Sequence, residues 1–131
     1  MIDKYERVRF DIHQEGAINK DILETLPFDY AGSATEVMYE TNEFTSVCPW
    51  TGLPDLGKLV IRYTPDLLLV ELKSLKYYLM SYRNVGILQE HAVNRILHDL
   101  VDLLKPVSLT VEGDFNERGG LKTKAVATYN R

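Results

Sequence analysis

The chain is poor in cysteine, in histidine and in long apolar runs. Its 131 residues include one cysteine, Cys48, and three histidines. A single thiol cannot form an internal disulfide, which is typical of a reducing compartment, and scattered histidines do not supply a metal-ligand cluster. No run approaches the ~18 apolar residues of a membrane-spanning helix, and the first residues lack the apolar segment of a signal peptide. We therefore expect a cytoplasmic protein without a catalytic metal.

A strong excess of charge of one sign is also missing. Fifteen Lys and Arg residues stand against 19 Asp and Glu, a formal net charge of -4. This balance gives no support for non-specific binding to nucleic acid or to an anionic membrane. There is no internal repeat and no low-complexity linker. The length predicts one domain over residues 1–131, in which residues 1–33 form an N-terminal extension.

Alternation of apolar and polar residues predicts four main strands. From Thr35, for example, Val37, Tyr39 and Thr41 alternate with Glu36, Met38, Glu40 and Asn42. The same period of two recurs in three later segments. These segments are 58–63, 107–112 and 121–129. Residues 67–72 form an additional short apolar run, and residues 21–26 are expected to form a short helical turn stopped by Pro27.

Two helices are predicted between the second and third strands. The first follows Ser74, a good N-cap, and places Leu75, Tyr78 and Tyr82 on one face. The second covers residues 93–104 and stops before a proline. The order of elements predicts an α+β fold, an antiparallel four-stranded sheet with two helices on one face. Such a sheet has two open edges, so we expect an oligomer that closes the sheets into a barrel.

The loop FTSVCPWTGLPD, residues 44–55, carries the single thiol. Cys48 lies outside any periodic apolar segment, among proline and glycine residues that impose loop geometry. Cys48 is therefore a candidate nucleophile, and Asp55 is close enough in sequence to act as its proton partner. The alternatives are a small buried hydrophobe at Cys48 and a surface turn residue at Asp55. Spacing alone leaves both readings open.

A second segment, ELKSLKYYLMSYRN, places two cations at a predicted helix start. Lys73 and Lys76 are three residues apart, so their ammonium groups and the free N–H groups of the first turn can bind a phosphate together. The alternative is two solvated lysines on an exposed helix face. No G-x-G-x-x-G motif follows a strand, so a Rossmann dinucleotide site is not predicted.

These motifs together resemble a known enzyme family. The stretches FTSVCPWTGLPD, VELKSLKYYLMSYRN, and QEHAVNRI with the later FNERGGL occur in the order found in the short, single-domain NADPH-dependent 7-cyano-7-deazaguanine reductases. They span roughly residues 44–121. The resemblance implies the tunnelling fold, shared with GTP cyclohydrolase I, and a homodecamer of two stacked pentamers. It also implies queuosine biosynthesis and, with it, tRNA modification, with no direct contact with nucleic acid.

The resemblance also implies a chemical mechanism. In this family a cysteine, matched by Cys48, attacks the nitrile carbon and forms a thioimide, which accepts hydride more readily than a nitrile does. An aspartate, matched by Asp55, moves the protons. Two NADPH molecules supply the hydrides that convert the nitrile to an aminomethyl group.

Further residues match binding positions of the family. Glu90 matches the carboxylate that accepts two hydrogen bonds from a guanine-like edge; without the resemblance, a solvated first-turn glutamate is the simpler reading. The other matched substrate positions are Val70, Glu71, Leu72 and Gln89. The matched cofactor positions, which bind NADPH phosphates, are Lys73, Lys76 and Arg118.

The chain departs from the family pattern at two positions. Gln89 stands where a histidine often precedes the substrate glutamate, and glutamine cannot become a cation near neutral pH. The sequence therefore does not predict a proton-transfer role at that position. Glu117 replaces the proline expected before the Arg-Gly-Gly turn.

Two other classes of function stay open. One is a tunnelling-fold relative with different chemistry on a purine-like or pterin-like substrate, such as a cyclohydrolase or an amidine-forming transferase. A metal-dependent cyclohydrolase needs a Cys and His ligand cluster, and the transferase does not need Lys73 and Lys76. The other is a non-catalytic purine-binding protein, which needs Glu90 but neither Cys48 nor Asp55.

Overall fold

From residue 37 onward the elements follow one another in the order that the sequence predicts. The computed structural model describes residues 12–131, and the first part of the predicted N-terminal extension, residues 1–11, lies outside the described residues. Two 3-10 turns, Glu15–Ala17 and Lys20–Ile22, precede the first strand. The strands and helices are β1 (Thr25–Pro27), β2 (Val37–Val47), β3 (Pro54–Thr64), β4 (Leu68–Val70), α1 (Leu72–Met80), α2 (Gln89–Leu104), β5 (Ser108–Phe115) and β6 (Lys124–Asn130).

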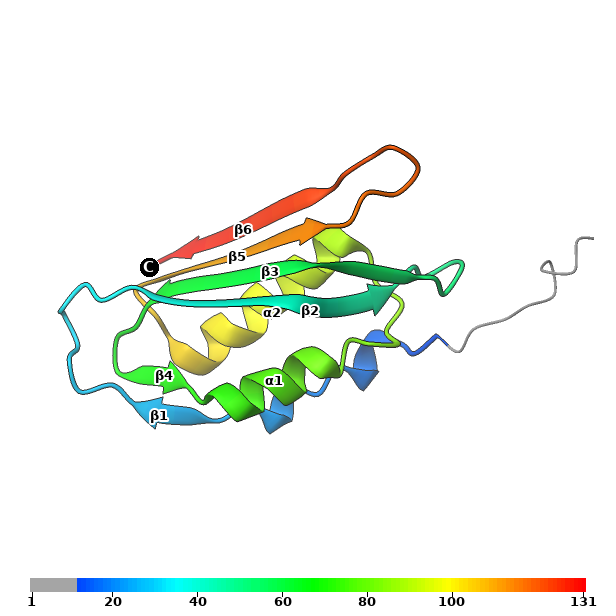
Figure 1. Cartoon of the computed structure of the whole chain (residues 1–131). Helices are drawn as coiled ribbons and strands as arrows, with labels where there is room; N and C mark the ends of the chain where they lie inside the picture. The colour runs from blue at the N-terminus through cyan, green and yellow to red at the C-terminus, as the bar shows by residue number, and fades with distance from the viewer. Residues whose placement is uncertain (1–11) are drawn as a thin grey trace, which may run out of the picture.

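The main sheet has four antiparallel strands in the order β2-β3-β5-β6, and α1 and α2 lie on one face of it (Figure 1). The core lies between that face and the helices, and its fully buried side chains include Ile61, Ile96 and Val111. The predicted α+β architecture is therefore confirmed. Strands β2 and β6 are the two edges, and within one chain their outer sides pair with no described strand.

The N-terminal part of the described chain differs from the predicted helical turn. Only Lys20–Ile22 is a 3-10 turn, and Thr25–Pro27 is a strand. The strand forms because β4, the predicted short apolar run, offers it a partner: Thr25 pairs with Val70 in a separate two-stranded sheet. A tertiary contact thus overrides the local preference.

A bulge in β2 decides which residues near the cysteine face the helices. The pairing with β3 shifts register between Thr41 and Phe44. Before the shift Tyr39 and Thr41 face inward, whereas after it Phe44 and Ser46 do so, and both are buried. Since side chains in a strand alternate with a period of two, one extra residue exchanges the faces. Ser46 is thereby placed directly opposite Asp55.

The predicted N-cap of α1 is wrong by three residues. Glu71 caps the helix, and its carboxylate accepts hydrogen bonds from the backbone N–H of Lys73, at 3.1 Å, and of Ser74, at 2.6 Å. Ser74 is instead in the first turn, where its hydroxyl accepts a bond from the N–H of Glu24. A carboxylate is favoured at a helix N-terminus because it satisfies free N–H groups and complements the helix dipole. The N–H groups expected to bind a phosphate are therefore already occupied.

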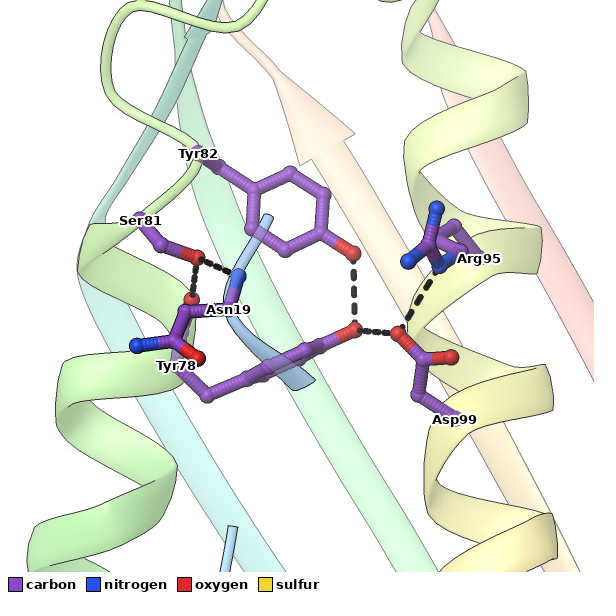
Figure 2. Close-up of polar contacts among 6 residues, drawn as sticks. All are labelled: Asn19, Tyr78, Ser81, Tyr82, Arg95 and Asp99. Carbon is purple, nitrogen blue, oxygen red and sulfur yellow. Dashed lines mark hydrogen bonds and ion pairs between the residues drawn. The ribbon is translucent and has the colours of Figure 1, made fainter. Parts of the chain in front are cut away.

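A cluster of four polar side chains joins α1 to α2 (Figure 2). The Tyr78 hydroxyl donates to Oδ2 of Asp99 at 2.6 Å and lies 2.8 Å from the Tyr82 hydroxyl, while Nε of Arg95 donates to the same Oδ2 at 2.9 Å. Both tyrosines are fully buried. Burial, the largest cause, raises the pKa of both phenols. The interhelix cluster, Tyr78, Tyr82, Arg95 and Asp99, fixes the two helices relative to each other.

The interhelix cluster predicts how stability depends on pH. A tyrosine in an unfolded chain ionises at about pH 10, whereas folded Tyr78 stays neutral there because its pKa is raised. The contribution of Tyr78 to the unfolding free energy is complete below about pH 10. Above that pH the unfolded chain loses the phenol proton and the folded chain keeps it, so the unfolding free energy falls by about 1.4 kcal/mol per pH unit. We expect Tyr78→Phe to reduce the fall of the unfolding free energy above pH 10 by about that slope. Urea unfolding at fixed protein concentration measures it.

The exposed Tyr30 offers a matched control, because its side chain is largely in solvent. Tyr30→Phe removes a phenol of the same kind and is expected to leave the alkaline slope as it is in the unsubstituted chain. Equal slopes in Tyr78→Phe and in the unsubstituted chain would contradict the assigned role of the cluster.

Candidate active site

The thiol is held in a tight turn between β2 and β3, at the far end of these two strands from the β4-α1 junction (Figure 1). The N–H of Cys48 donates to the carbonyl of Leu53 at 2.9 Å, and the N–H of Gly52 donates to the carbonyl of Cys48 at 2.9 Å. Gly52 has φ +73°, a conformation that other residues rarely adopt. The turn therefore fixes the backbone and leaves the Cys48 side chain half-buried at the end of the sheet.

The surroundings of Cys48 favour its thiolate. Burial acts to raise the pKa of the thiol. Hydrogen bonds from the Thr51 side chain and from the backbone N–H groups of Thr51 and Trp50 outweigh this, so the pKa lies below its ordinary value. A lowered thiol pKa is what a cysteine nucleophile needs near neutral pH.

Asp55 is a buried strand residue rather than a surface turn residue. It is the second residue of β3 and only 5% exposed, on the face that continues into Leu59 and Ile61. Burial, the largest cause, raises the pKa of its carboxyl group. The Arg118 guanidinium acts in the opposite direction, and the charge of Glu90 raises the pKa further, so the net shift is upward. A raised pKa makes the carboxylate a stronger base, which is the direction that a proton-transfer group requires.

Arg118 lies in the turn between β5 and β6. Its Nη1 donates to Oδ1 of Asp55 in the same chain. The N–H of Asn116 donates to the carbonyl of Leu56 at 2.8 Å, which ties the start of the turn to β3 next to Asp55. The sequence predicted Arg118 as a cofactor residue; in the structure of the single chain its partner is the candidate proton donor.

The first turn of α2 comes to the same end of the sheet. The N–H of Val47 donates to the carbonyl of Val85 at 3.0 Å, and the N–H of Ile87 donates to the carbonyl of Val47 at 3.2 Å. These bonds attach the segment before α2 to the residue before Cys48. Glu90, in that first turn, is exposed and within electrostatic range of Asp55. Gln89 is its half-buried neighbour.

Gly86, between Val85 and Ile87, allows this close attachment. A Cβ at position 86 would lie 3.1 Å from Cα of Pro49, tighter than most real contacts of a Cβ. The cysteine turn and the segment that leads into α2 therefore pack backbone to backbone.

The predicted site residues fall into two groups. Cys48, Asp55, Gln89, Glu90 and Arg118 form the cysteine group, at one end of the sheet. Val70, Glu71, Leu72, Lys73 and Lys76 form the lysine group, around the start of α1.

The two groups are far apart in one chain. The N–H of Val70 donates to the Tyr63 hydroxyl at 3.2 Å, so the start of the lysine group lies beside Tyr63 of β3. Tyr63 and Asp55 are eight residues apart on one strand, which is roughly 26 Å at ~3.3 Å per residue. Figure 1 shows β4 and the cysteine turn at opposite ends of the sheet. A single chain does not bring the two groups together.

Two hollows adjoin the cysteine group without containing it. One, of about 450 Å³, lies between β2 and α1 and has Lys76 and Arg83 on its wall. The other, of about 530 Å³, is lined by Gly52, Pro54 and again Arg83. Neither is lined by Cys48, Asp55 or Glu90. In one chain these two hollows therefore do not hold the candidate reactive residues: Asp55 is buried, Cys48 is half-buried and Glu90 is exposed.

Sequence reasoning missed three residues of this region. Thr51 binds the thiol, Arg83 lines both hollows, and the Ser46 hydroxyl is fully buried beside Asp55 without a hydrogen-bond partner. Thr51 had a signal, since a hydroxyl three residues after Cys48 in the same turn can donate a hydrogen bond to it. Ser46 had none, because its inward orientation depends on the bulge in β2.

Residues 12–131 contain no group of three or more His, Cys, Asp or Glu side chains arranged to hold a metal ion. None of the helices in this part of the chain is long and apolar enough to cross a membrane.

Comparison with known proteins identifies close relatives. The family model described as QueF-like protein matches residues 54–131. A protein of Caldicellulosiruptor bescii, named NADPH-dependent 7-cyano-7-deazaguanine reductase, is 62% identical over 131 residues, all of both chains. A protein of the same name from Thermoanaerobacter pseudethanolicus is 60% identical over 131 residues, which are all of this chain and 98% of that protein. The crystal structure of the archaeosine synthase QueF-Like in the apo form has a TM-score of 0.67 over 73% of this chain and 94% of its own, at 24% identity, and so shares the fold.

Proposed function

Because the chain belongs to the QueF-like family, we propose that it is an NADPH-dependent 7-cyano-7-deazaguanine reductase, which reduces the nitrile to the aminomethyl group in queuosine biosynthesis. One observation supports this chemistry above all. A thiol with a lowered pKa, Cys48, lies within electrostatic range of a buried carboxyl group with a raised pKa, Asp55. The proposal includes a cytoplasmic location, which the single cysteine favours.

The Cys48 thiol and the Asp55 carboxyl group act together in covalent capture of the nitrile. Sγ of Cys48 forms a bond to the nitrile carbon, and the triple bond to nitrogen becomes a double bond. The proton that leaves the thiol passes through the Asp55 carboxyl group to that nitrogen, so capture needs no external acid or reductant. Asp55 then supplies the protons that reduction requires.

Glu90 and Gln89 recognise the base in this proposal. A guanine-like edge presents a ring N–H and an amino group side by side, and one carboxylate accepts hydrogen bonds from both. Glu90 is exposed at the start of α2, on the side where the helix attaches to the cysteine turn. Gln89 adds donor and acceptor groups next to it.

The residues available for NADPH are cations on and after α1. Lys73 and Lys76 are exposed, and Lys76 and Arg83 border the hollow between β2 and α1, whose floor includes Leu75 and Leu79. The lining also includes Glu40 and Glu43 on the β2 side, so the cations that can meet phosphates lie on the α1 side, next to apolar side chains that can contact flat rings. When bound, NADPH supplies hydride. The lysine side chains bind its phosphates without the N–H groups of the first turn, because Glu71 occupies those groups.

The separation of the two groups supports a site shared between subunits. Roughly 26 Å of strand separates the cysteine group from the start of the lysine group in one chain, and both edges of the sheet are open. Edge-to-edge pairing hides the edges and brings the lysine group of one subunit to the cysteine group of its neighbour. We expect the homodecamer of two pentamers that the family resemblance implies.

Mixing two inactive variants tests the shared site. Cys48→Ala removes the nucleophile and the double substitution Lys73→Ala with Lys76→Ala removes the cations. If each site takes one group from each of two chains, co-refolded mixtures regain some sites with both groups intact, up to about one-quarter of the activity for random pairing. Steady-state NADPH oxidation measures the recovery. A fully active monomer in sedimentation would contradict the arrangement.

The function itself is tested by mixing the protein with 7-cyano-7-deazaguanine and NADPH. We expect loss of the nicotinamide absorbance and, when NADPH is left out, a mass increase of one substrate per chain. Adduct formation without NADPH oxidation would identify an amidine-forming transferase instead. Substrate binding with neither result would identify a purine-binding protein.

Glu90→Gln tests recognition of the base. Glutamine keeps the shape but replaces an acceptor-only group by one that also donates, so one charge-assisted bond is lost, about 1.5–3 kcal/mol. We expect substrate affinity to fall roughly tenfold to a hundredfold, as measured by calorimetry with Cys48→Ala as the background. Glu117→Gln is a control on an exposed turn. Unchanged affinity in Glu90→Gln would exclude Glu90 from the site.

A further inference from the structure

Asp55 has two neighbours that offer it hydrogen bonds, and only one of them is engaged. Nη1 of Arg118 donates to Oδ1 of Asp55. On the adjoining strand Ser46 lies directly opposite Asp55, and its hydroxyl is fully buried without a partner. Residues directly opposite in an antiparallel pair share a face, with Cβ atoms about 4.5–5.5 Å apart. The carboxyl group therefore has a second polar neighbour if Arg118 moves away.

Arg118 is placed so that it can leave. Its side chain is 44% exposed, whereas that of Asp55 is 6% exposed, so the arginine reaches in from solvent to a buried group. The two following residues, Gly119 and Gly120, have φ +58° and +83°, and a Cβ on either would meet no atom within 4 Å. The backbone of Arg118 is held by two hydrogen bonds with Leu121, at 2.8 and 2.9 Å, so the movement that we consider is one of the half-exposed side chain, which can turn toward another anion without moving a strand.

Loss of Arg118 leaves the carboxyl group of Asp55 in surroundings that favour its neutral form. Burial raises the pKa of Asp55, and so does the charge of Glu90 on α2, while Arg118 acts against both. The remaining groups that face Asp55 are the Cys48 thiol at the turn and the neutral Ser46 hydroxyl on β2. Arg118 is the one cation within range of Asp55 among the groups that shift its titration.

We infer that Arg118 is a removable counter-charge, which keeps Asp55 ionised while the nitrile is captured and then releases it to act as a proton donor. The release occurs when Arg118 turns to a phosphate group of the incoming NADPH. The inference rests on the proposed function, and it makes Arg118 a positioning residue that acts through Asp55.

The number of protons that each step needs explains why Asp55 is useful both with and without Arg118 beside it. Capture needs one proton shared by Cys48 and Asp55, because the thiol proton ends on the nitrile nitrogen and the carboxyl group is left ionised. The following reduction needs a further proton at that nitrogen, so Asp55 must take one up from solvent. A carboxylate paired with Arg118 resists this uptake, and a buried carboxylate without a cation favours it.

The test follows the pH dependence of capture without NADPH. Intact-protein mass measures how fast 7-cyano-7-deazaguanine adds to Cys48 between pH 5 and pH 9. In Arg118→Gln we expect the acidic limb of the profile to move up by about one pH unit, the low end of the effect of a nearby cation, because Arg118 is half-exposed. Arg118→Lys keeps the charge and is expected to restore most of the original position.

The departure of Arg118 is tested with 2′,5′-ADP, a phosphate ligand that carries no hydride. It is expected to move the acidic limb of the unsubstituted protein in the same direction as Arg118→Gln does, and to cause no further shift in that variant. The matched control is Lys122→Gln, which removes a cation from the same turn; Lys122 pairs with Asp114 at 3.1 Å and is expected to leave the limb in place.

Three results would overturn the inference: an unchanged acidic limb in Arg118→Gln, an equal shift in Lys122→Gln, or no effect of 2′,5′-ADP on the unsubstituted protein. Failure of the unsubstituted protein to form any adduct would instead contradict the proposed function. In that case alkylation of Cys48 by iodoacetamide gives the same comparison, since the charge of Asp55 raises the pKa of the Cys48 thiol. Its pH profile then reports the ionisation of Asp55 in each variant.

Discussion

Cys48→Ala is expected to form no adduct with 7-cyano-7-deazaguanine and to lose NADPH oxidation by on the order of a thousandfold or more. Without Sγ the nitrile must accept hydride directly, and a nitrile is a poor acceptor. Substrate affinity is expected to stay, because Glu90 and Gln89 make the polar contacts with the base. Intact mass, NADPH absorbance and calorimetry separate these three quantities.

The fold of Cys48→Ala is expected to persist, because the thiol is at a half-buried turn outside the core. Thr51→Val is an informative companion, since it removes the hydroxyl that helps to lower the pKa of the Cys48 thiol. Thr51→Val is expected to slow capture of the nitrile at neutral pH. The capture rate is expected to recover as the pH rises, because the thiol then ionises without the help of the hydroxyl. An adduct of full yield in Cys48→Ala would show that another residue is the nucleophile.

Asp55→Asn is expected to slow both capture and NADPH oxidation by roughly a hundredfold to ten-thousandfold, the range for loss of a general acid–base group. The amide has nearly the same shape but does not take up or release a proton near neutral pH. Single-turnover adduct formation measures the first step, and NADPH absorbance measures the whole reaction.

Asp66→Asn is the matched control, because Asp66 also pairs with an arginine, Arg131 at 3.0 Å, at the other end of β3 from Asp55. It removes one ion pair and is expected to leave both rates close to those of the unsubstituted protein. If Asp55→Asn retained full activity, the proton path assigned to this carboxyl group would be wrong.

The arrangement of the fold could be predicted from the sequence because it depends on periodic patterns. The alternation at Leu59, Ile61 and Tyr63 marks the inward face of β3, and the same period extended backward also places Asp55 inward. The strand pattern thus contained the evidence for a buried Asp55, although a proline-rich turn next to it suggested the surface. The amphipathic residues of both helices were equally informative, since each helix buries one continuous face.

Details that depend on partners distant in sequence could not be predicted. Serine is a preferred N-cap and glutamate is not, so local preference favours Ser74. In the structure Glu71 caps the helix, and the Ser74 hydroxyl accepts a hydrogen bond from the N–H of Glu24, 50 residues away. The bulge in β2 turned Ser46 inward without any glycine or proline to mark it. The ion pair between Arg118 and Asp55 joins residues 63 positions apart, and the sequence gives no distance between their elements. The roles of the site residues stay predictions until the variants are measured.

Gly86 has a consequence for redesign of the enzyme. A Cβ at position 86 would lie 3.1 Å from Cα of Pro49 and 2.4 Å from Cγ2 of Ile12, so any larger residue there forces its neighbours to shift. Because backbone hydrogen bonds also join the segment before α2 to Val47, we expect the cysteine turn and the start of α2 to move together. Engineering a larger base-binding site by lengthening the segment before α2 would therefore displace the thiol as well. Libraries that vary the two segments together, with glycine retained at position 86, are the ones in which altered substrate choice and intact reactivity can occur in the same protein.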